Sequence, residues 1–160
     1  MSNAAVNRPR PPAPGDRAQV VTLRLDGQLI GLPIEQVLDV FQVVEPQPVP
    51  LTAPSVVGLV NLRGRILPVL SLAGLLGLPK KLPGKTRMAV GVPWRGEIYG
   101  VEIDDIGDVI EVSLAASEPL PAHLGETWAR AARCVHKLER GLMIELDLVA
   151  LLEQPLTVAA

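Results

Sequence analysis

Apolar and polar residues alternate with a period of two in short runs along this chain, and polar turns separate the runs. From Val21 to Leu25 the side chains are alternately apolar and polar, as in a strand with one buried face. Further strands are predicted over residues 29–32, 88–92, 98–103 and 109–114. A polar residue precedes glycine at four predicted hairpin tips: Asp26-Gly27, Arg63-Gly64, Arg95-Gly96 and Arg140-Gly141. This pattern predicts an all-β barrel or sandwich with a few short helices.

Helical features occur at three places. After Pro33, a helical face formed by Ile34, Val37, Leu38 and Phe41 predicts one short amphipathic helix. A strand over residues 39–45 competes with it, because this segment is rich in β-branched valine. Ser71 and Asp147 are predicted to cap two further short helices. Residues 127–138, many of them small, are predicted as one long strand.

A central hairpin is predicted where two apolar runs flank the polar tip Asn61-Leu62-Arg63-Gly64-Arg65. Gly64 supplies the backbone freedom that a tight reversal needs. An arginine at such a tip is presented to water and can form forked bonds to carboxylates. A solvated turn is the simpler interpretation of such a tip, because charged side chains prefer the surface. Pro68 lies within the second strand, which predicts an edge strand or a bulge there.

The segment from Val49 to Val69 resembles the signature of the CheW-like domain family. The family's pattern has a Pro, an Ala-Pro pair, a Gly-Val-(Ile/Val)-Asn-Leu-Arg-Gly run and a Pro-Val pair. This chain has Pro50, Ala53-Pro54, Gly-Leu-Val-Asn-Leu-Arg-Gly at residues 58–64 and Pro68-Val69. Further similarity covers roughly residues 18–153, with the clearest matches at residues 33–40, 99–110 and 141–148. The chain departs from the family at Ser71 and Ala73, where Asp and Arg are usual, and it matches poorly over residues 125–136.

The resemblance implies two SH3-like five-stranded β-barrel subdomains that share a central apolar core. It implies a CheW-like domain over residues 18–156, preceded by residues 1–17, a proline-rich tail whose composition predicts disorder. The implied function is that of a non-catalytic adaptor in a chemosensory array for chemotaxis or motility. Its implied partners are the cytoplasmic tip of a methyl-accepting chemoreceptor, the regulatory domain of a CheA-type histidine kinase and other CheW-like domains. The candidate protein-interaction residues are Val37, Asp39, Gly58, Asn61, Arg63 and Gly64.

Composition narrows the function classes further. Hydrophobic residues make up 48% of the 160 residues and aromatic residues only 2%, so the core must be aliphatic. The net charge of -2 and the lack of a basic patch argue against nucleic acid as a partner. Cys134 is the single cysteine, which excludes an intrachain disulfide and suits a reducing compartment. The sequence shows no leader-like segment and no apolar run of the ~18 residues that a membrane helix needs. We therefore expect a cytoplasmic protein without direct membrane insertion. The family resemblance implies that it is recruited to membrane-associated receptor arrays.

Few residues suggest catalysis or metal binding. Asp104 and Asp105 are adjacent, so in a strand they would point to opposite faces. Cys134 and His136 would share a strand face, but the sequence indicates no further ligand, and structural zinc takes four. We therefore predict no catalytic, metal or cofactor site. The alternative is a small β-barrel ligand-binding protein or enzyme that uses Asp104 and His136.

Overall fold

The chain folds into two five-stranded sheets. The computed structural model describes residues 17–50, 55–78 and 87–153. The predicted tail therefore lies outside the described residues except for Arg17, which begins the first strand. The order of the first sheet is β8 (Asp105–Ser113), β1 (Arg17–Leu25), β2 (Gln28–Pro33), β10 (Gly141–Leu146) and β9 (Ala132–Leu138). The order of the second is β3 (Asp39–Val43), β6 (Arg87–Trp94), β7 (Glu97–Ile103), β5 (Arg65–Ser71) and β4 (Val56–Leu62).

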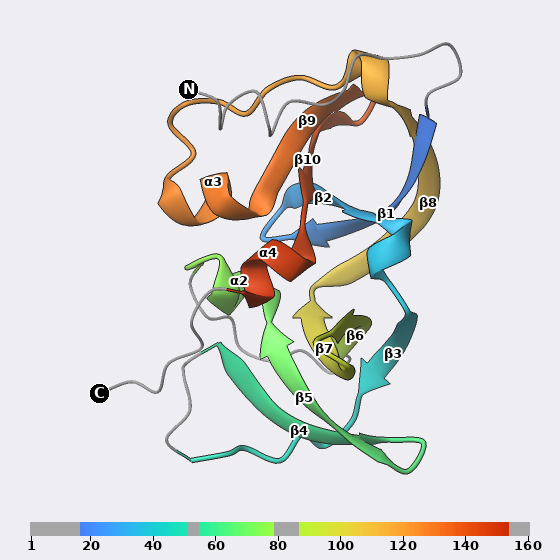
Figure 1. Ribbon diagram of the computed structural model, residues 1–160, viewed down its shortest axis with the longest axis vertical. Helices are drawn as coiled ribbons and strands as arrows, with labels where there is room; N and C mark the ends of the chain where they lie inside the picture. The colour runs from blue at the N-terminus through green and yellow to red at the C-terminus, as the bar shows by residue number, and fades with distance from the viewer. Residues whose placement is uncertain (1–16, 51–54, 79–86, 154–160) are drawn as a thin grey trace.

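Both sheets are strongly curled and lie at opposite ends of the molecule (Figure 1). Neighbouring strands are antiparallel except for the pairs β2–β10 and β5–β7, which are parallel. The expectation of a mostly β protein with two five-stranded units is confirmed.

Three of the four predicted hairpin tips have the backbone conformation that their sequence favours. Asp26-Gly27, Arg63-Gly64 and Arg95-Gly96 all have positive φ at both residues, between 50° and 85°. This is the backbone of a two-residue turn whose twist matches that of the flanking strands. At the fourth tip only Gly141 has a positive φ, so this turn is of another kind.

Two predicted elements are wrong. The amphipathic helix after Pro33 is only the single 3-10 turn η1 (Ile34–Gln36), and the competing strand forms instead as β3, which pairs with β6. The long strand over residues 127–138 is also wrong in its first part, where α3 (Glu126–Ala131) precedes β9. Alanine favours helix, and Arg130 pairs with Glu126 one turn earlier, whereas pairing with β10 begins only at Ala132.

Both predicted helix caps are present. The Ser71 hydroxyl oxygen accepts a hydrogen bond from the Gly74 N–H, 3.1 Å away, at the start of α2 (Leu72–Leu75). The Asp147 carboxylate accepts one from the Ala150 N–H, 3.2 Å away, at the start of α4 (Leu148–Leu152). A second 3-10 turn, η2 (Leu114–Ala116), follows β8.

The prediction for Pro68 is partly correct. β5 lies inside its sheet rather than at the edge, but its pairing with β7 covers only residues 69–71. Pro68 precedes that paired stretch, so its missing N–H removes no bond to β7. The strand opposite, β4, has a register shift between Val56 and Gly58.

The apolar side chains form three cores. The largest contains residues of both sheets and of the helix α4 between them, including Leu25, Leu32, Leu70, Val90, Val101, Leu148, Leu151 and Leu152. A second core lies within the second sheet around Phe41, Val60 and Val69. A third lies within the first sheet around Val20, Val112 and Met143. The shared core that the family resemblance implies is therefore present.

Within the described ranges, no helix has the length and apolar character needed to cross a membrane.

Candidate protein-interaction surface

The tip of the β4–β5 hairpin is held in a fixed shape by its own side chains. The Asn61 side-chain oxygen Oδ1 accepts a hydrogen bond from the Gly64 N–H at 3.1 Å, which closes the turn. Gly64 has a φ of 85° and nothing lies within 4 Å of where a Cβ would be. Asn61, Arg63 and Gly64 are all exposed. The hairpin therefore presents Arg63 to solvent from a rigid base.

An ion pair joins this tip to strand β3. The Arg63 guanidinium donates from Nη1 to Asp39 Oδ2 at 2.7 Å, across 24 positions of sequence. The other oxygen of Asp39 accepts from the Val40 N–H at 2.8 Å. The side chains of Arg63 and Asp39 are 72% and 35% exposed, so a partner can reach both. The structure thus brings together two candidate residues that are distant in the sequence.

The Asp39–Arg63 pair makes a prediction that titration can test. The hydrogen bond from Arg63, followed by that from Val40, lowers the pKa of Asp39 below its ordinary value of 3.8. A carboxylate with a lowered pKa contributes stability that is present above the ordinary value and lost as the pH falls through the folded value. Arg63→Ala should therefore raise the pKa of Asp39, as measured by NMR of the carboxyl carbon. Arg95→Ala is the control, and an equal pKa in wild type and Arg63→Ala would contradict the pairing in solution.

A groove lies beside this ion pair. We call it the tip groove, and its lining residues are Leu38, Asp39, Phe41, Leu62, Arg63, Arg65, Leu67, Gly91 and Ile98. The lining is mostly apolar, and three charged side chains accompany it. Leu38 is 59% exposed. An apolar groove with a few charged groups suits a protein segment better than a small polar substrate.

Sequence analysis did not predict most of the residues that line the tip groove. Leu38 was expected on the buried face of a helix, but it is exposed because β3 replaces that helix. Leu62, Leu67 and Ile98 have no distinguishing feature in the sequence, since they belong to strands that meet only in the folded sheet. Arg65 had been identified as part of the polar tip, and its charge was the one feature of the sequence that could have indicated a role at the surface.

Val37 and Gly58 occupy different environments from the tip residues. Val37 is half-buried and packs against the shared core just after η1. Gly58 is buried at the register shift in β4, with a φ of 149°. A Cβ at Gly58 would lie 2.4 Å from the Gln47 carbonyl oxygen. Gln47 and Leu59 exchange two backbone hydrogen bonds at 2.8 and 2.9 Å, so Gly58 allows this close approach of two backbones.

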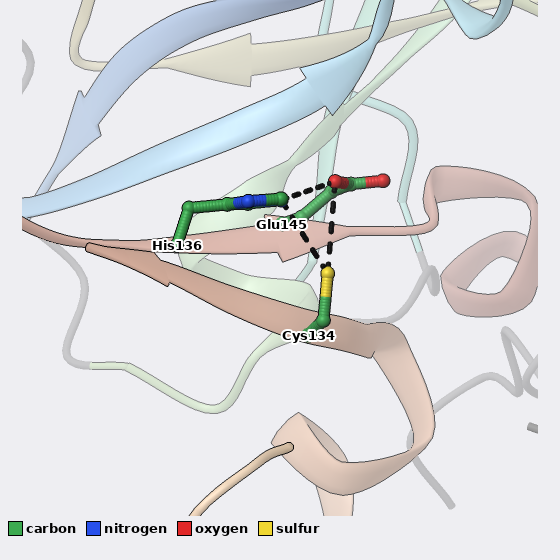
Figure 2. Close-up of side chains that lie close together, drawn as sticks. All are labelled: Cys134, His136 and Glu145. Carbon is green, nitrogen blue, oxygen red and sulfur yellow. Dashed lines mark hydrogen bonds and ion pairs between the residues drawn. The ribbon is translucent and has the colours of Figure 1, made fainter. Parts of the chain in front are cut away.

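The two residues of the enzymatic alternative have different partners. Asp104 is exposed after β7, and its Oδ2 accepts a hydrogen bond from the Asp26 N–H at 2.9 Å. His136 is buried in the first sheet, where Nε2 lies 2.7 Å from Glu145 Oε1 (Figure 2). The described structure therefore gives no acid–base pair formed by Asp104 and His136.

Comparison with known proteins agrees over nearly the whole chain. Residues 19–156 match the family model of the CheW-like domain. A probable chemotaxis protein CheW from Rhizobium etli is 23% identical over 91% of this chain and 94% of its own length. The chemotaxis protein CheW of Bacillus subtilis is 26% identical over 85% and 87%. The crystal structure of the scaffolding protein TtCheW from Thermoanaerobacter tengcongensis superposes with a TM-score of 0.76 at 26% identity, over 89% and 97%.

Proposed function

This chain belongs to the CheW-like family, and we propose that it is an adaptor that couples chemoreceptors to a CheA-type histidine kinase in a chemosensory array. The observation that carries the proposal is the match to CheW proteins over almost the whole length of both chains. A fold by itself does not define a function. Here the match also includes relatives named as chemotaxis proteins and a solved structure named as a scaffolding protein.

We place the receptor contact at the tip groove. Its apolar lining fits the apolar face of a helix, the usual arrangement when a helix binds in a groove. Arg63 and Asp39 flank it with one charge of each sign, which allows hydrogen bonds to polar residues at the end of a helical hairpin. Val37 adjoins this surface through its neighbour Leu38. Gly58 and Gly64 support it through the backbone rather than by contact.

We further propose that the kinase contacts the chain through its regulatory domain, barrel against barrel. Other CheW-like domains are further candidate partners, for the same reason. These contacts would recruit the chain to receptor arrays at the membrane.

The receptor contact is tested by Arg63→Ala. Truncation should weaken receptor binding at least ~30-fold, because an interface hot spot contributes ~2 kcal/mol or more. The free energy of unfolding should change by less than ~1 kcal/mol, since exposed ion pairs contribute little. Binding of a purified receptor cytoplasmic fragment and of the kinase regulatory domain would be measured by calorimetric titration, with urea unfolding in parallel.

Arg95→Ala is the matched control. Arg95 occupies the same turn position as Arg63, with a φ of 50° against 52°, at the tip of the β6–β7 hairpin. Its guanidinium lies over the Trp94 ring, 4.7 Å from the centroid, and Arg95 is not among the residues that line the tip groove. Equal binding by wild type and Arg63→Ala, or equal losses in the two variants, would refute the assignment of Arg63.

The comparisons do not favour the enzymatic alternative, because they name chemotaxis proteins and a scaffolding protein. An assay of the purified chain separates the two. An adaptor changes phosphate transfer only when kinase and receptor are both present. Turnover or phosphorylation by the chain alone, lost in Asp104→Asn or His136→Gln, would support the alternative.

A further inference from the structure

Three side chains of different metal-ligating types meet inside the first sheet. Cys134 and His136 come from β9 and Glu145 from β10, and Figure 2 shows the three side chains converging. Their exposed fractions are 7%, 3% and 5%. The adaptor function proposed above uses none of them. Buried charged or ionisable groups of this kind require a partner, because burial of an unpaired charge is strongly unfavourable.

The strand pairing explains why these three meet. Cys134 and His136 are two positions apart on β9 and share one face. Glu145 lies directly opposite Cys134 in the register of β9 and β10, so its side chain points to that same face. Met143, opposite His136, belongs to the core of the first sheet. The cluster therefore lies on the inner face of the curled first sheet, apart from the tip groove.

The distances suit a tetrahedral ion. Ligand atoms bound to tetrahedral zinc at their usual bond lengths lie about 3.3–3.7 Å from one another. Cys134 Sγ lies 3.4 Å from His136 Nε2 and 3.7 Å from Glu145 Oε1. The third separation, between Nε2 and Oε1, is 2.7 Å, the length of a hydrogen bond. Entry of an ion needs only this one contact to widen, by about 0.6–0.7 Å to reach the tetrahedral spacing.

We propose that Cys134, His136 and Glu145 form a binding site for a zinc ion. A thiolate, a carboxylate and a neutral imidazole together carry two negative charges, which Zn²⁺ neutralises in a buried place. On binding, the Cys134 thiol proton leaves to solvent, and the imidazole carries its proton on Nδ1 so that Nε2 is free to bind the ion.

The Cys134 thiol lies in a buried place beside the Glu145 carboxylate. Burial, and next the nearby Glu145 charge, raise the pKa of the Cys134 thiol from 9.0 to about 12.

The surroundings of the cluster provide a second layer of contacts. The Ser117 hydroxyl, which donates a hydrogen bond to the Leu114 carbonyl oxygen at 2.9 Å, lies near the Cys134 side chain. Arg133 Nη1 lies 3.7 Å from Glu145 Oε2, the oxygen that does not face the cluster's other members. Contacts of this type orient ligands and strengthen metal sites. With three protein ligands the fourth position falls to a water molecule. The ion would fasten β9 to β10, two strands of the sheet that lies away from the tip of the β4–β5 hairpin (Figure 1).

The test uses the tag-free full chain after treatment with a chelator. Zinc is titrated in competition with a chromophoric chelator, and Co²⁺ is added separately as a spectroscopic probe. We expect one ion per chain, a near-ultraviolet thiolate-to-cobalt charge-transfer band, and a rise in the thermal midpoint of about 5–10 °C with zinc at about 100 times its Kd. Cys134→Ser and His136→Gln should each weaken zinc binding at least ~100-fold, beyond the effect of losing an outer contact.

The chain offers a matched control in His123, its other histidine, which is exposed. His123→Gln should bind zinc as wild type does. Zinc binding that survives in folded Cys134→Ser and His136→Gln, a cobalt spectrum without the thiolate band, or no binding at all would overturn the proposal. If the variants do not fold, the wild-type cobalt spectrum decides, together with the loss of its thiolate band when added zinc displaces the cobalt.

Discussion

Gly58→Ala should lower the free energy of unfolding by at least about 3 kcal/mol, the sum of a backbone conformation that side chains avoid and a collision with another backbone. Gly58 has a φ of 149°, in a region that residues with a Cβ rarely adopt. The added Cβ would lie 2.4 Å from the Gln47 carbonyl oxygen and 2.8 Å from its carbon. Neither atom can rotate away, because Gln47 is held to Leu59 by two backbone hydrogen bonds.

Gly64→Ala is the control for Gly58→Ala. Gly64 also has a positive φ, 85°, but open space surrounds its missing Cβ. Gly64→Ala should therefore lower the free energy of unfolding only by the cost of placing alanine at a positive φ, about 1 kcal/mol. Urea unfolding of both variants measures the difference. If both variants lost a similarly small free energy of unfolding, the backbone at Gln47 would have to move easily away from the added Cβ. Wild-type stability of Gly58→Ala with lost receptor binding would make Gly58 a contact residue instead.

Leu151→Ala should lower the free energy of unfolding by about 2–5 kcal/mol, the usual range for a fully buried leucine. Leu151 is 0% exposed, and it lies on α4 in the core that both sheets share. The cavity would therefore remove contacts from both five-stranded units together. We expect one cooperative unfolding transition, shifted to lower urea, rather than the separate loss of one sheet.

Leu142→Ala is the matched control for Leu151→Ala. Leu142 lies on β10 and is 55% exposed, so its truncation should change stability by no more than about 0.5 kcal/mol. Fluorescence and circular dichroism would follow the two variants and wild type. Two separate transitions in Leu151→Ala would show that the sheets unfold independently and that the shared core does not couple them.

Local interactions explain what the sequence alone predicted. The three turns at Asp26, Arg63 and Arg95 need two residues with positive φ, and glycine after a polar residue encodes that directly. The caps at Ser71 and Asp147 bond to N–H groups three residues ahead, within the same segment. The alternation of apolar and polar residues, together with the family resemblance, was then sufficient to predict the fold class. The candidate residues Asp39 and Arg63 also came from that resemblance, without any indication that they are paired.

Tertiary structure decided everything that depends on strand partners. The segment after Pro33 has both helical and strand features, and pairing of β3 with β6 selected the strand. The Asp39–Arg63 pair, the tip groove and the Cys134–His136–Glu145 cluster each join residues from different strands or from the turns beside them. Glu145 was not recognised as a neighbour of Cys134, because that contact depends on the register of two strands. The sequence by itself determined most of the strands and turns. Sheet order and register determined which side chains meet, because those depend on contacts between distant segments.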